Sequence, residues 1–350
     1  MATLSDIAEK ANLSIATVSR VLNMDNSLSI TIENKRKIFE IAEELNYTKY
    51  KDKKKQHKQD KPLTKATLKS DTLAVIQRYK ESEELEDAYY LSIRLGAEKR
   101  ATELGYNLLM INNIDDIEDT KIVGGIAIGN YNEKELKALN RKIKNLCVIG
   151  SSFPIASFDA VNTDFTSATL EAMEYLYQKG HRKIAFIGAE ETDDMYGYRK
   201  FRAPTTNAYY DFMKAKQLFR KDYFIVASNM PLEVSNGEKL TLEALKLWKD
   251  DLPTAILAAN DAMAIGINHV LTAEKIKIPE DISLMGINDI TVSRYITPPL
   301  TTVKVYTEEA GEIGIETVHN RITNPSIYRR VLLTTDIIER QSILDVNKGN

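Results

Sequence analysis

The chain has 350 residues, of which 43% are hydrophobic and 28% are charged, and its formal net charge at pH 7 is −3. This length predicts more than one domain, and the composition is that of a globular protein. No apolar run is long enough to span a bilayer, no signal peptide is evident, and the single Cys147 excludes an internal disulfide and a cysteine-clustered zinc site, so we expect a cytoplasmic protein without membrane contact.

The N-terminal segment is predicted to form three short helices. An N-cap signal at residues 3–6 begins the first, residues 17–22 make the second, and the third lies near residues 33–45. A tight turn separates the first two, which is typical of a helix-turn-helix module that places its second helix in the major groove of DNA. A three-helix cap with an ordinary solvated face would show the same apolar spacing.

The polar face of the second helix carries side chains that suit DNA. Arg20 can bond twice to a guanine edge, Ile15 can contact a thymine methyl group, and Ala16 is small enough for the backbone to approach the bases. Beside them lie short donors suited to phosphate oxygens, namely Thr17, Ser19 and Asn23. Residues 1–69 contain 14 Lys and Arg against 9 Asp and Glu, while the rest of the chain contains 33 against 41. A basic end on an acidic body favours DNA binding over a simple cap.

The stretch from residue 47 to residue 70 holds nine lysines and almost no apolar periodicity. This composition predicts a linker that acts as a solvated tether, as an arm in contact with DNA, or as both. We therefore expect a helix-turn-helix domain at residues 1–48 and a lysine-rich linker at residues 49–70.

Beyond the linker, short apolar runs alternate with segments of helical spacing. This alternation predicts parallel βαβ units, numerous enough for an α/β body of two doubly wound parallel-sheet subdomains, at 71–163 with 292–325 and at 164–291 with 326–345. Ligands of such folds bind beyond the carboxyl ends of the strands. The expected strands are 72–77, 107–112, 124–129, 146–150, 183–188, 224–228, 254–260 and 282–288, and the expected helices are 89–106, 133–144, 165–179, 205–217, 238–249 and 262–274.

The N-terminus resembles that of lactose/galactose-repressor (LacI/GalR) family regulators in the stretch TLSDIAEKANLSIATVSRVLN and onward through IFEIAEELNY. The body resembles the family's periplasmic-binding-protein-like core in KGHRKIAFIG, AILAANDAMAIG, IPEDISLMGINDI and PPLTTVKV. Within the family, the body is most similar to repressors of β-galactosidase and galactose-utilisation genes in ELEDAYYLSIRLGAEKRATELG. The resemblance implies a homodimer that places two recognition helices in successive major grooves of a near-palindromic site.

The resemblance also implies roles for individual residues of the N-terminal domain. Ile15, Ala16 and Arg20 would read bases. The other expected DNA contacts, mostly to phosphates, are Thr3, Ser14, Thr17, Ser19, Asn23 and Ser29. In the family, a hinge helix follows this domain, and one of its leucines enters the minor groove of DNA. This helix is not evident here, because the position of that leucine falls near Gln56, among lysines. Leu63 could serve in another register. This departure predicts weaker DNA bending and a larger electrostatic share of the affinity.

The segment after the first strand of the body has the side chains of a sugar site. Asp87 can accept two hydroxyl protons and either Tyr89 or Tyr90 can stack on a sugar ring, although Asp87 could instead be a helix N-cap and the tyrosines surface or dimer residues. Arg202 resembles the family's sugar-contacting arginine, with Arg199 as a competitor. The remaining expected effector contacts are Asn260, Asn288, Asp289 and Tyr306.

Two other side chains near these positions are expected to be structural. Asp261 is expected to cap the helix that follows it. Trp248 shares helical spacing with Leu242 and Leu245, which favours a place in the core over ligand stacking.

These features predict a repressor of sugar-utilisation genes, galactose or β-galactoside genes by resemblance, that a sugar effector bound between the subdomains releases from operator DNA. We expect no enzyme activity, cofactor or metal, because the sequence lacks G-x-G-x-x-G after the first strand, a P-loop, G-x-S-x-G and H-E-x-x-H. The alternatives are a regulator of another carbohydrate operon, a constitutive DNA-binding protein with a vestigial pocket, and a sugar-binding transport protein. The expected partners are double-stranded operator DNA, a small sugar and a second copy of the chain.

Overall fold

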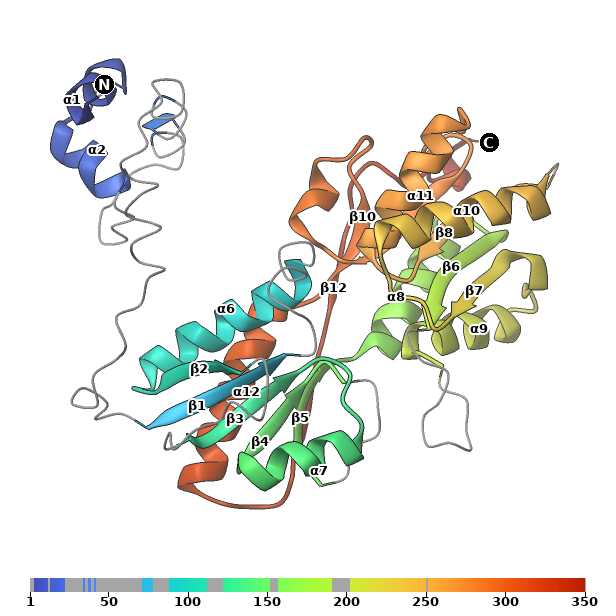
Figure 1. Ribbon diagram of the computed structural model, residues 1–350. Helices are drawn as coiled ribbons and strands as arrows, with labels where there is room; N and C mark the ends of the chain where they lie inside the picture. The colour runs from blue at the N-terminus through green and yellow to red at the C-terminus, as the bar shows by residue number, and fades with distance from the viewer. Residues whose placement is uncertain are drawn as a thin grey trace. The chain divides into compact units, whose positions relative to one another are not determined.

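The computed structural model describes residues 3–11, 13–22, 34, 37–38, 41, 71–77, 88–111, 122–151, 157–190, 202–249 and 251–349. Two compact units make up the chain, Met1–Lys69 and Ser70–Asn350 (Figure 1). The predicted linker at residues 49–70 lies outside the described residues.

The first unit contains α1 (Leu4–Ala11) and α2 (Ile15–Leu22), joined by a tight turn as predicted. Thr3 starts α1, because its hydroxyl accepts a hydrogen bond from the Asp6 amide at 3.3 Å and its own amide donates to the Asp6 carboxylate at 2.7 Å. Both helices place their apolar residues on one face. The resulting core consists of Ile7, Ala8, Ala11, Val18, Val21, Ile38 and Ile41.

The described residues of the second unit form two six-stranded sheets. The strands are β1 (Thr72–Gln77), β2 (Asn107–Ile111), β3 (Ile122–Ile128), β4 (Leu146–Ile149), β5 (Asp159–Thr163), β6 (Ile184–Glu190), β7 (Phe224–Ser228), β8 (Ala255–Ala258), β9 (Ser283–Asn288), β10 (Thr301–Lys304), β11 (Arg330–Leu333) and β12 (Asp336–Ile338). The first sheet has the order β11-β5-β4-β3-β1-β2 and is parallel throughout. The second has the order β12-β10-β9-β8-β6-β7, and only its edge strand β12 is antiparallel to its neighbour. Two doubly wound sheets are thus confirmed.

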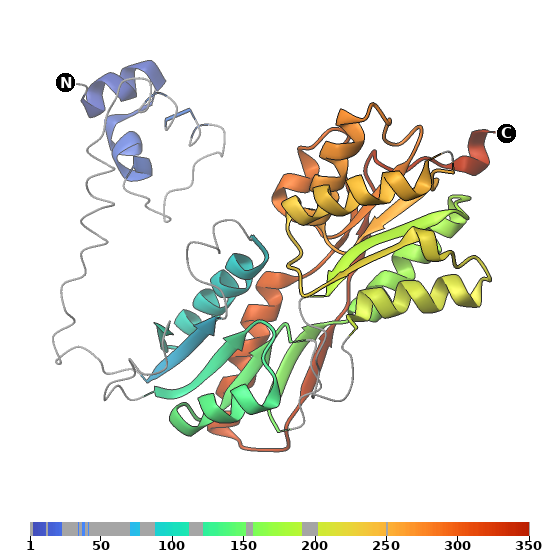
Figure 2. The same ribbon diagram turned by 45° about the vertical axis from the view of Figure 1, so that its right-hand side comes forward.

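Helices cover both faces of the first sheet. Because successive side chains of a strand point to opposite faces, Leu73 of β1 packs in the core with α6 (Ala88–Glu103) and α12 (Thr307–Thr323), whereas Ala74 packs with α7 (Glu133–Lys142). Figures 1 and 2 both show α6 and α12 side by side. They approach so closely that a Cβ at Gly96 would lie 2.0 Å from the carbonyl oxygen of Glu308.

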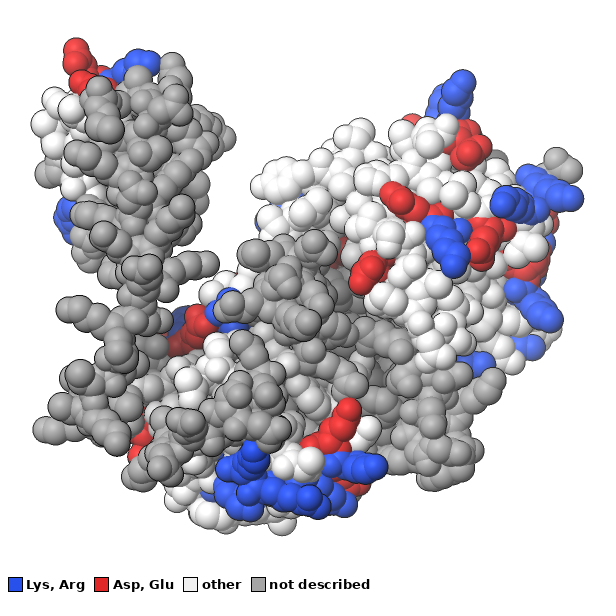
Figure 3. Space-filling view, viewed as in Figure 1, with Lys and Arg blue, Asp and Glu red and all other residues white. Residues whose placement is uncertain are grey.

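The surface helix α7 is stabilised at both ends. Asn132 and Glu135 form a reciprocal capping box at its start, with hydrogen bonds of 3.0 and 2.9 Å. Arg141 and Lys142 occupy its last turn, where the helix dipole favours cations. Lys and Arg side chains accordingly gather over this helix in Figure 3.

The second sheet lies between two pairs of helices, α8 (Phe165–Gln178) with α9 (Pro204–Ala215) and α10 (Val234–Trp248) with α11 (Asp261–Ala273) (Figure 1). Helices on both faces bury its central strands completely, which explains why those strands are continuous apolar runs in the sequence. Trp248 is 2% exposed and its indole donates to the carbonyl oxygen of Asp222 at 2.8 Å, so the predicted core position is confirmed.

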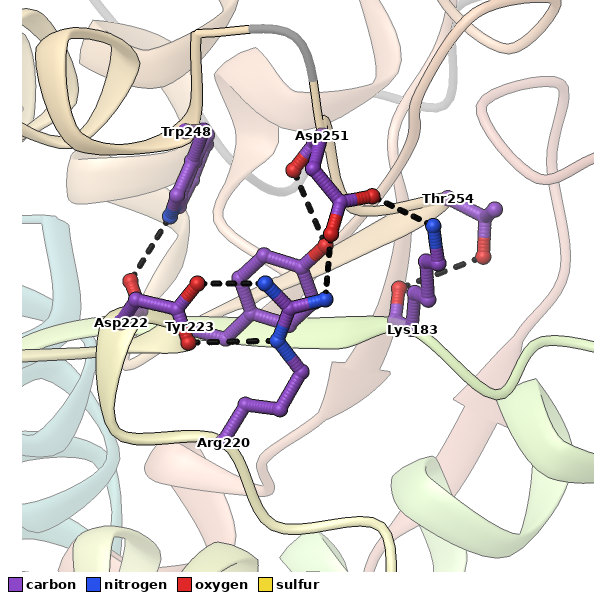
Figure 4. A network of polar contacts seen from close by, with 7 residues as sticks. All are labelled: Lys183, Arg220, Asp222, Tyr223, Trp248, Asp251 and Thr254. Carbon is purple, nitrogen blue, oxygen red and sulfur yellow. Dashed lines mark hydrogen bonds and ion pairs between the residues drawn. The ribbon is translucent and has the colours of Figure 1, made fainter.

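A polar network joins the segments at the amino ends of β6 and β8 (Figure 4). Arg220 bonds to the carboxylates of both Asp222 and Asp251, and Lys183 bonds to Asp251 at 2.5 Å. The Tyr223 hydroxyl donates to the carbonyl oxygen of Asp251 at 3.0 Å. These charged side chains pair with one another at the amino ends of the strands. They connect the loops there and do not belong to the carboxyl edge of the sheet, where a ligand is expected.

The predicted division of the C-terminal third between the subdomains is wrong at two strands. β10 pairs with β9 and belongs to the second sheet, although residues 292–325 were expected in the first subdomain. β11 pairs with β5 and belongs to the first sheet, although residues 326–345 were expected in the second. Both strands are short, and apolar spacing identifies a strand without identifying the sheet that it joins.

Candidate functional site

The outward face of α2 carries most of the predicted DNA-contacting residues. Ile15 is 51% exposed and Arg20 is exposed, whereas Val18 and Val21 are buried. Ser14 precedes the helix and caps it, because its hydroxyl accepts from the Thr17 amide at 3.1 Å. An exposed isoleucine in the first turn of a surface helix and an exposed arginine in its last turn present one apolar and one cationic group to solvent, as base reading in a major groove requires.

The other predicted DNA-contacting residues are only partly placed. Thr3 is exposed at the start of α1, and Ser19 is partly exposed on α2. Ala16 lies in α2, and its side chain is outside the described part of the structure. Asn23 and Ser29 lie outside the described residues altogether.

A pocket of about 210 Å³ lies in the second unit, between the start of α6, the segment after β9 and the start of α12. Of the predicted effector residues, it brings together Tyr89, Asn288 and Asp289. Its complete lining is Tyr89, Ser92, Asn288, Asp289, Ile290, Thr291, Arg294, Lys304, Val305, Thr307, Glu308 and Glu309. This lining is mainly polar, and it combines strands β9 and β10 of the second sheet with helices α6 and α12, which pack on the first.

The segment that supplies Asn288 and Asp289 has an unusual backbone. Asn288 has φ +128° and Asp289 has φ +54°, conformations that side-chain-bearing residues rarely adopt and that surrounding contacts must hold in place. Arg340 supplies one such contact, because its guanidinium donates to the Asp289 carboxylate and to the carbonyl oxygen of Leu300. Arg294 adds a longer contact to Asp289 at 3.5 Å. The Asp289 side chain is 6% exposed and contacts two arginines, so its charge holds the backbone of the pocket segment in place.

The buried carboxylate of Asp261 fastens the same segment from the other side. It accepts hydrogen bonds from the Ile290 amide at 3.0 Å and from the hydroxyls of Ser293 and Thr302, both at 2.5 Å. Complete burial raises its pKa to about 6 against the opposing effect of these hydrogen bonds. Thr302 lies on β10, so one carboxylate connects α11, the pocket segment and β10.

The helix cap predicted for Asp261 is therefore wrong, and the cap of α11 is Asn260. The Asn260 side-chain oxygen accepts from the Met263 amide at 2.8 Å, and its amide donates to the carbonyl oxygen of Leu232 at 2.9 Å. Asn260 is partly exposed, and the pocket lining does not include it.

The remaining predicted effector residues are not among those that line the pocket. Tyr90 meets Tyr89 edge to face, with ring centroids 5.1 Å apart. The Tyr306 hydroxyl donates to the Asp336 carboxylate. Arg202 is exposed, and its guanidinium carbon lies 5.3 Å from the ring centre of Tyr210. The predicted Asp87 lies outside the described residues.

Several residues that line or support the pocket have no counterpart among the sequence-based predictions. Lys304 ends β10 and lines the pocket. Its place at the carboxyl end of a strand is a signal by which the sequence could have identified it. Arg340 follows β12 and reaches Asp289 from 51 positions away, for which the sequence offers no local signal. The other unpredicted lining residues with polar side chains are Ser92, Thr291, Arg294, Thr307, Glu308 and Glu309.

Within the described ranges, no three His, Cys, Asp or Glu side chains are grouped as a metal site would require. None of the helices in that same part of the chain is both long and apolar enough to cross a bilayer.

Two family models match the chain. One describes bacterial regulatory proteins of the lacI family and matches residues 3–49, which include α1 and α2. The other describes a periplasmic binding protein-like domain and matches residues 173–343, which include the second sheet and α12.

Curated relatives match over almost the whole length. The chain is 35% identical to the HTH-type transcriptional regulator GalR of Streptococcus thermophilus, over 93% of this chain and 94% of that one. It is 32% identical to the regulator GanR of Bacillus subtilis (strain 168), over 98% of this chain and 100% of that one.

Solved structures share the fold. A transcriptional regulator CelR–cellobiose complex matches with a TM-score of 0.68 at 21% identity, over 98% of this chain and 100% of that one. A lac repressor dimer bound to operator and the anti-inducer ONPF matches with a TM-score of 0.64 at 20% identity, over 98% and 99% of the two chains.

Proposed function

Because the chain belongs to the lacI family of bacterial regulatory proteins, we propose that it represses genes for the use of a galactose-containing sugar and that this sugar is its inducer. Family membership makes the chain a transcriptional regulator rather than an enzyme, and it agrees with the predicted cytoplasmic location. The sugar is proposed on the similarity to regulators named GalR and GanR.

The observation that carries the DNA-binding part is the amphipathic character of α2. Its apolar side is buried in a small core, while Ile15 and Arg20 are exposed on the other side. In this proposal Ile15, Ala16 and Arg20 read base edges in the major groove. The proposed phosphate and other DNA contacts are Thr3, Ser14, Thr17, Ser19, Asn23 and Ser29.

The pocket supports an effector that acts on both subdomains. Tyr89 belongs to the first subdomain, and Asn288 and Lys304 belong to the second, so a ligand among them would contact both. A ligand shifts a conformational equilibrium only by its difference in affinity between the two states, and contacts to both subdomains provide that difference. The coupling is reciprocal, so operator DNA weakens inducer binding by the factor by which inducer weakens DNA binding. The proposed effector contacts remain Asp87, Tyr89, Tyr90, Arg202, Asn260, Asn288, Asp289 and Tyr306.

A homodimer is the proposed working form, because a near-palindromic site needs two recognition helices. Exposed apolar side chains on the body support this proposal. Leu95 on α6 is 46% exposed and Tyr295, just after the pocket segment, is 77% exposed. A second copy of the chain would bury such side chains.

The test is a footprint of the purified chain on the DNA upstream of its own gene neighbourhood, at moderate salt, with and without galactosides. We expect protection of a near-palindromic site that galactosides abolish. Absence of protection at any such site would contradict the repressor, whereas protection that no galactoside alters would contradict the effector alone.

A further inference from the structure

Five exposed cations lie at the amino ends of strands β4 and β11 in the first sheet. Two of them are in the last turn of α7, one lies between α7 and β4, and the other two lie at the start of β11. Only β5 separates β4 from β11, so these strand ends are about 10 Å apart. Figure 3 shows the part of this surface that covers α7. The surface is called the basic edge below, and its residues are Arg141, Lys142, Lys144, Arg329 and Arg330.

The acid beside the basic edge is already neutralised. The Asp159 carboxylate is buried and receives two hydrogen bonds from the Arg321 guanidinium, at 2.7 and 3.0 Å, and one from the Arg329 amide at 2.7 Å. Within the described ranges, the side chains of Arg141, Lys144 and Arg329 form no ion pair with a carboxylate. Their positive charge is therefore available to an anionic partner.

The charge of the basic edge is opposite to that of the body around it. Beyond residue 69 the chain contains 33 Lys and Arg against 41 Asp and Glu, so a cluster of unpaired cations is an exception there. Cations in such a cluster repel one another, and an anion that contacts several of them relieves this repulsion.

The linker that carries the helix-turn-helix domain joins the body at the same edge of the first sheet. The carbonyl oxygen of Asp71 accepts from the Asn107 amide at 3.1 Å, which places residue 71 at the amino ends of β1 and β2. All strands of this sheet are parallel, so the amino ends of β4 and β11 face the same way. The pocket is at the other end, where α6 and α12 begin.

We propose that the basic edge is a second DNA-binding surface, which contacts phosphates of the duplex that flanks the operator. This inference rests on the DNA binding proposed above for α2. A domain that holds the operator through a tether keeps the neighbouring DNA at a high effective concentration near the point where the tether enters the body. Arginine and lysine side chains bind phosphate oxygens whatever the base sequence, so this surface adds affinity and salt dependence without sequence preference.

The test measures the affinity of the full chain for two operator duplexes over a range of salt concentrations. The short duplex ends at the half-sites, and the long one continues for about ten base pairs, one helical turn, on each side. The test variant is R141Q/K144Q/R329Q. The control is K221Q/K246Q/K277Q, which removes the same charge from three exposed lysines of the second subdomain. Thermal unfolding of both variants checks that they fold.

We expect R141Q/K144Q/R329Q to bind the long duplex about tenfold more weakly than the wild-type chain. The slope of the logarithm of affinity against that of salt should become less steep by up to about 2.7, because each of three lost phosphate contacts contributes about 0.9. On the short duplex the test variant should match the wild-type chain. The control variant should match it on both duplexes.

Three results would overturn the inference. An unchanged slope on the long duplex would exclude phosphate contacts and leave the basic edge to an acidic protein. An equal loss on both duplexes would place the lost contacts within the half-sites. A wild-type chain that binds neither duplex would overturn the DNA binding proposed for α2 as well, which distinguishes that failure from the first two.

Discussion

The guanidinium of Arg340 donates to the carboxylate of Asp289, and the two residues are 51 positions apart in the chain. The Arg340 side chain is 13% exposed and that of Asp289 is 6% exposed, so this is a buried ion pair. It ties the segment after β12 to the pocket segment, whose backbone at Asn288 and Asp289 has positive φ. The shape of the pocket therefore depends on a residue outside it.

Replacing Arg340 by Ala should lower the free energy of unfolding by about 3–5 kcal/mol, because it leaves the buried Asp289 charge without its close partner. Urea denaturation measures this loss. R294A is the matched control: Arg294 is 50% exposed and lies 3.5 Å from the same carboxylate, so its loss should be below about 1 kcal/mol. Equal losses for the two variants would contradict the assigned role of Arg340.

Asp261 should make stability depend on pH in an identifiable direction. Its pKa is about 6 in the folded chain against the ordinary 3.8, so the folded state holds the proton more tightly. The associated stability is fully present below about pH 4 and is lost as the pH rises through 6, a change of about 3 kcal/mol. The measurement is the difference in unfolding free energy between the wild-type chain and D261N from pH 4 to pH 7. This difference should fall with rising pH, and a flat or rising difference would argue against a carboxyl group whose pKa is raised.

Replacing Arg20 by Ala and replacing Ser19 by Ala should weaken DNA binding in two different ways. R20A should lose about 1–3 kcal/mol of specific affinity and tolerate a changed base at one operator position, because a bidentate contact to a guanine edge carries sequence information. S19A should weaken binding almost equally for all sequences, because a phosphate contact carries none. Fluorescence anisotropy with operator duplexes that differ at single positions separates the two patterns. If R20A lost the same affinity for every duplex, that result would contradict base reading by Arg20.

The lysine-rich linker should steepen the salt dependence of DNA binding. Each phosphate neutralised contributes a slope of about −0.9 to the logarithmic plot of affinity against salt. Substituting glutamine at five of the nine linker lysines should therefore flatten the slope; these five are Lys51, Lys53, Lys54, Lys55 and Lys58. An unchanged slope would show that the linker is a tether without DNA contact.

Sequence patterns predicted most strands and helices of the body to within a few residues, because each element obeys a local rule. Buried parallel strands appear as apolar runs, and the helices between them keep one apolar face. The same patterns placed Trp248 in the core correctly. They were less successful where a residue acts on a distant part of the chain.

Asn260 and Asp261 illustrate this limit. Both are good cap residues, and the local sequence does not decide between them. The choice is made by Ser293 and Thr302, whose hydroxyls surround a carboxylate that can accept both, so Asp261 turns inward and Asn260 caps the helix. Glu190 is a related case, because a charged residue after an apolar run suggests the end of a strand, whereas β6 continues to Glu190 and the buried carboxylate accepts from the Ala203 amide.

The described chain passes between the two sheets three times, at residues 163–165, 304–307 and 333–336. A single proteolytic cut at any one of these crossings would leave two covalent connections between the halves, and the fragments would stay assembled through their shared sheets. Neither half is a continuous segment, so neither can be obtained by simple truncation. The body is consequently a poor candidate for division into separately expressed lobes and a good one for a nicked protein that keeps its fold.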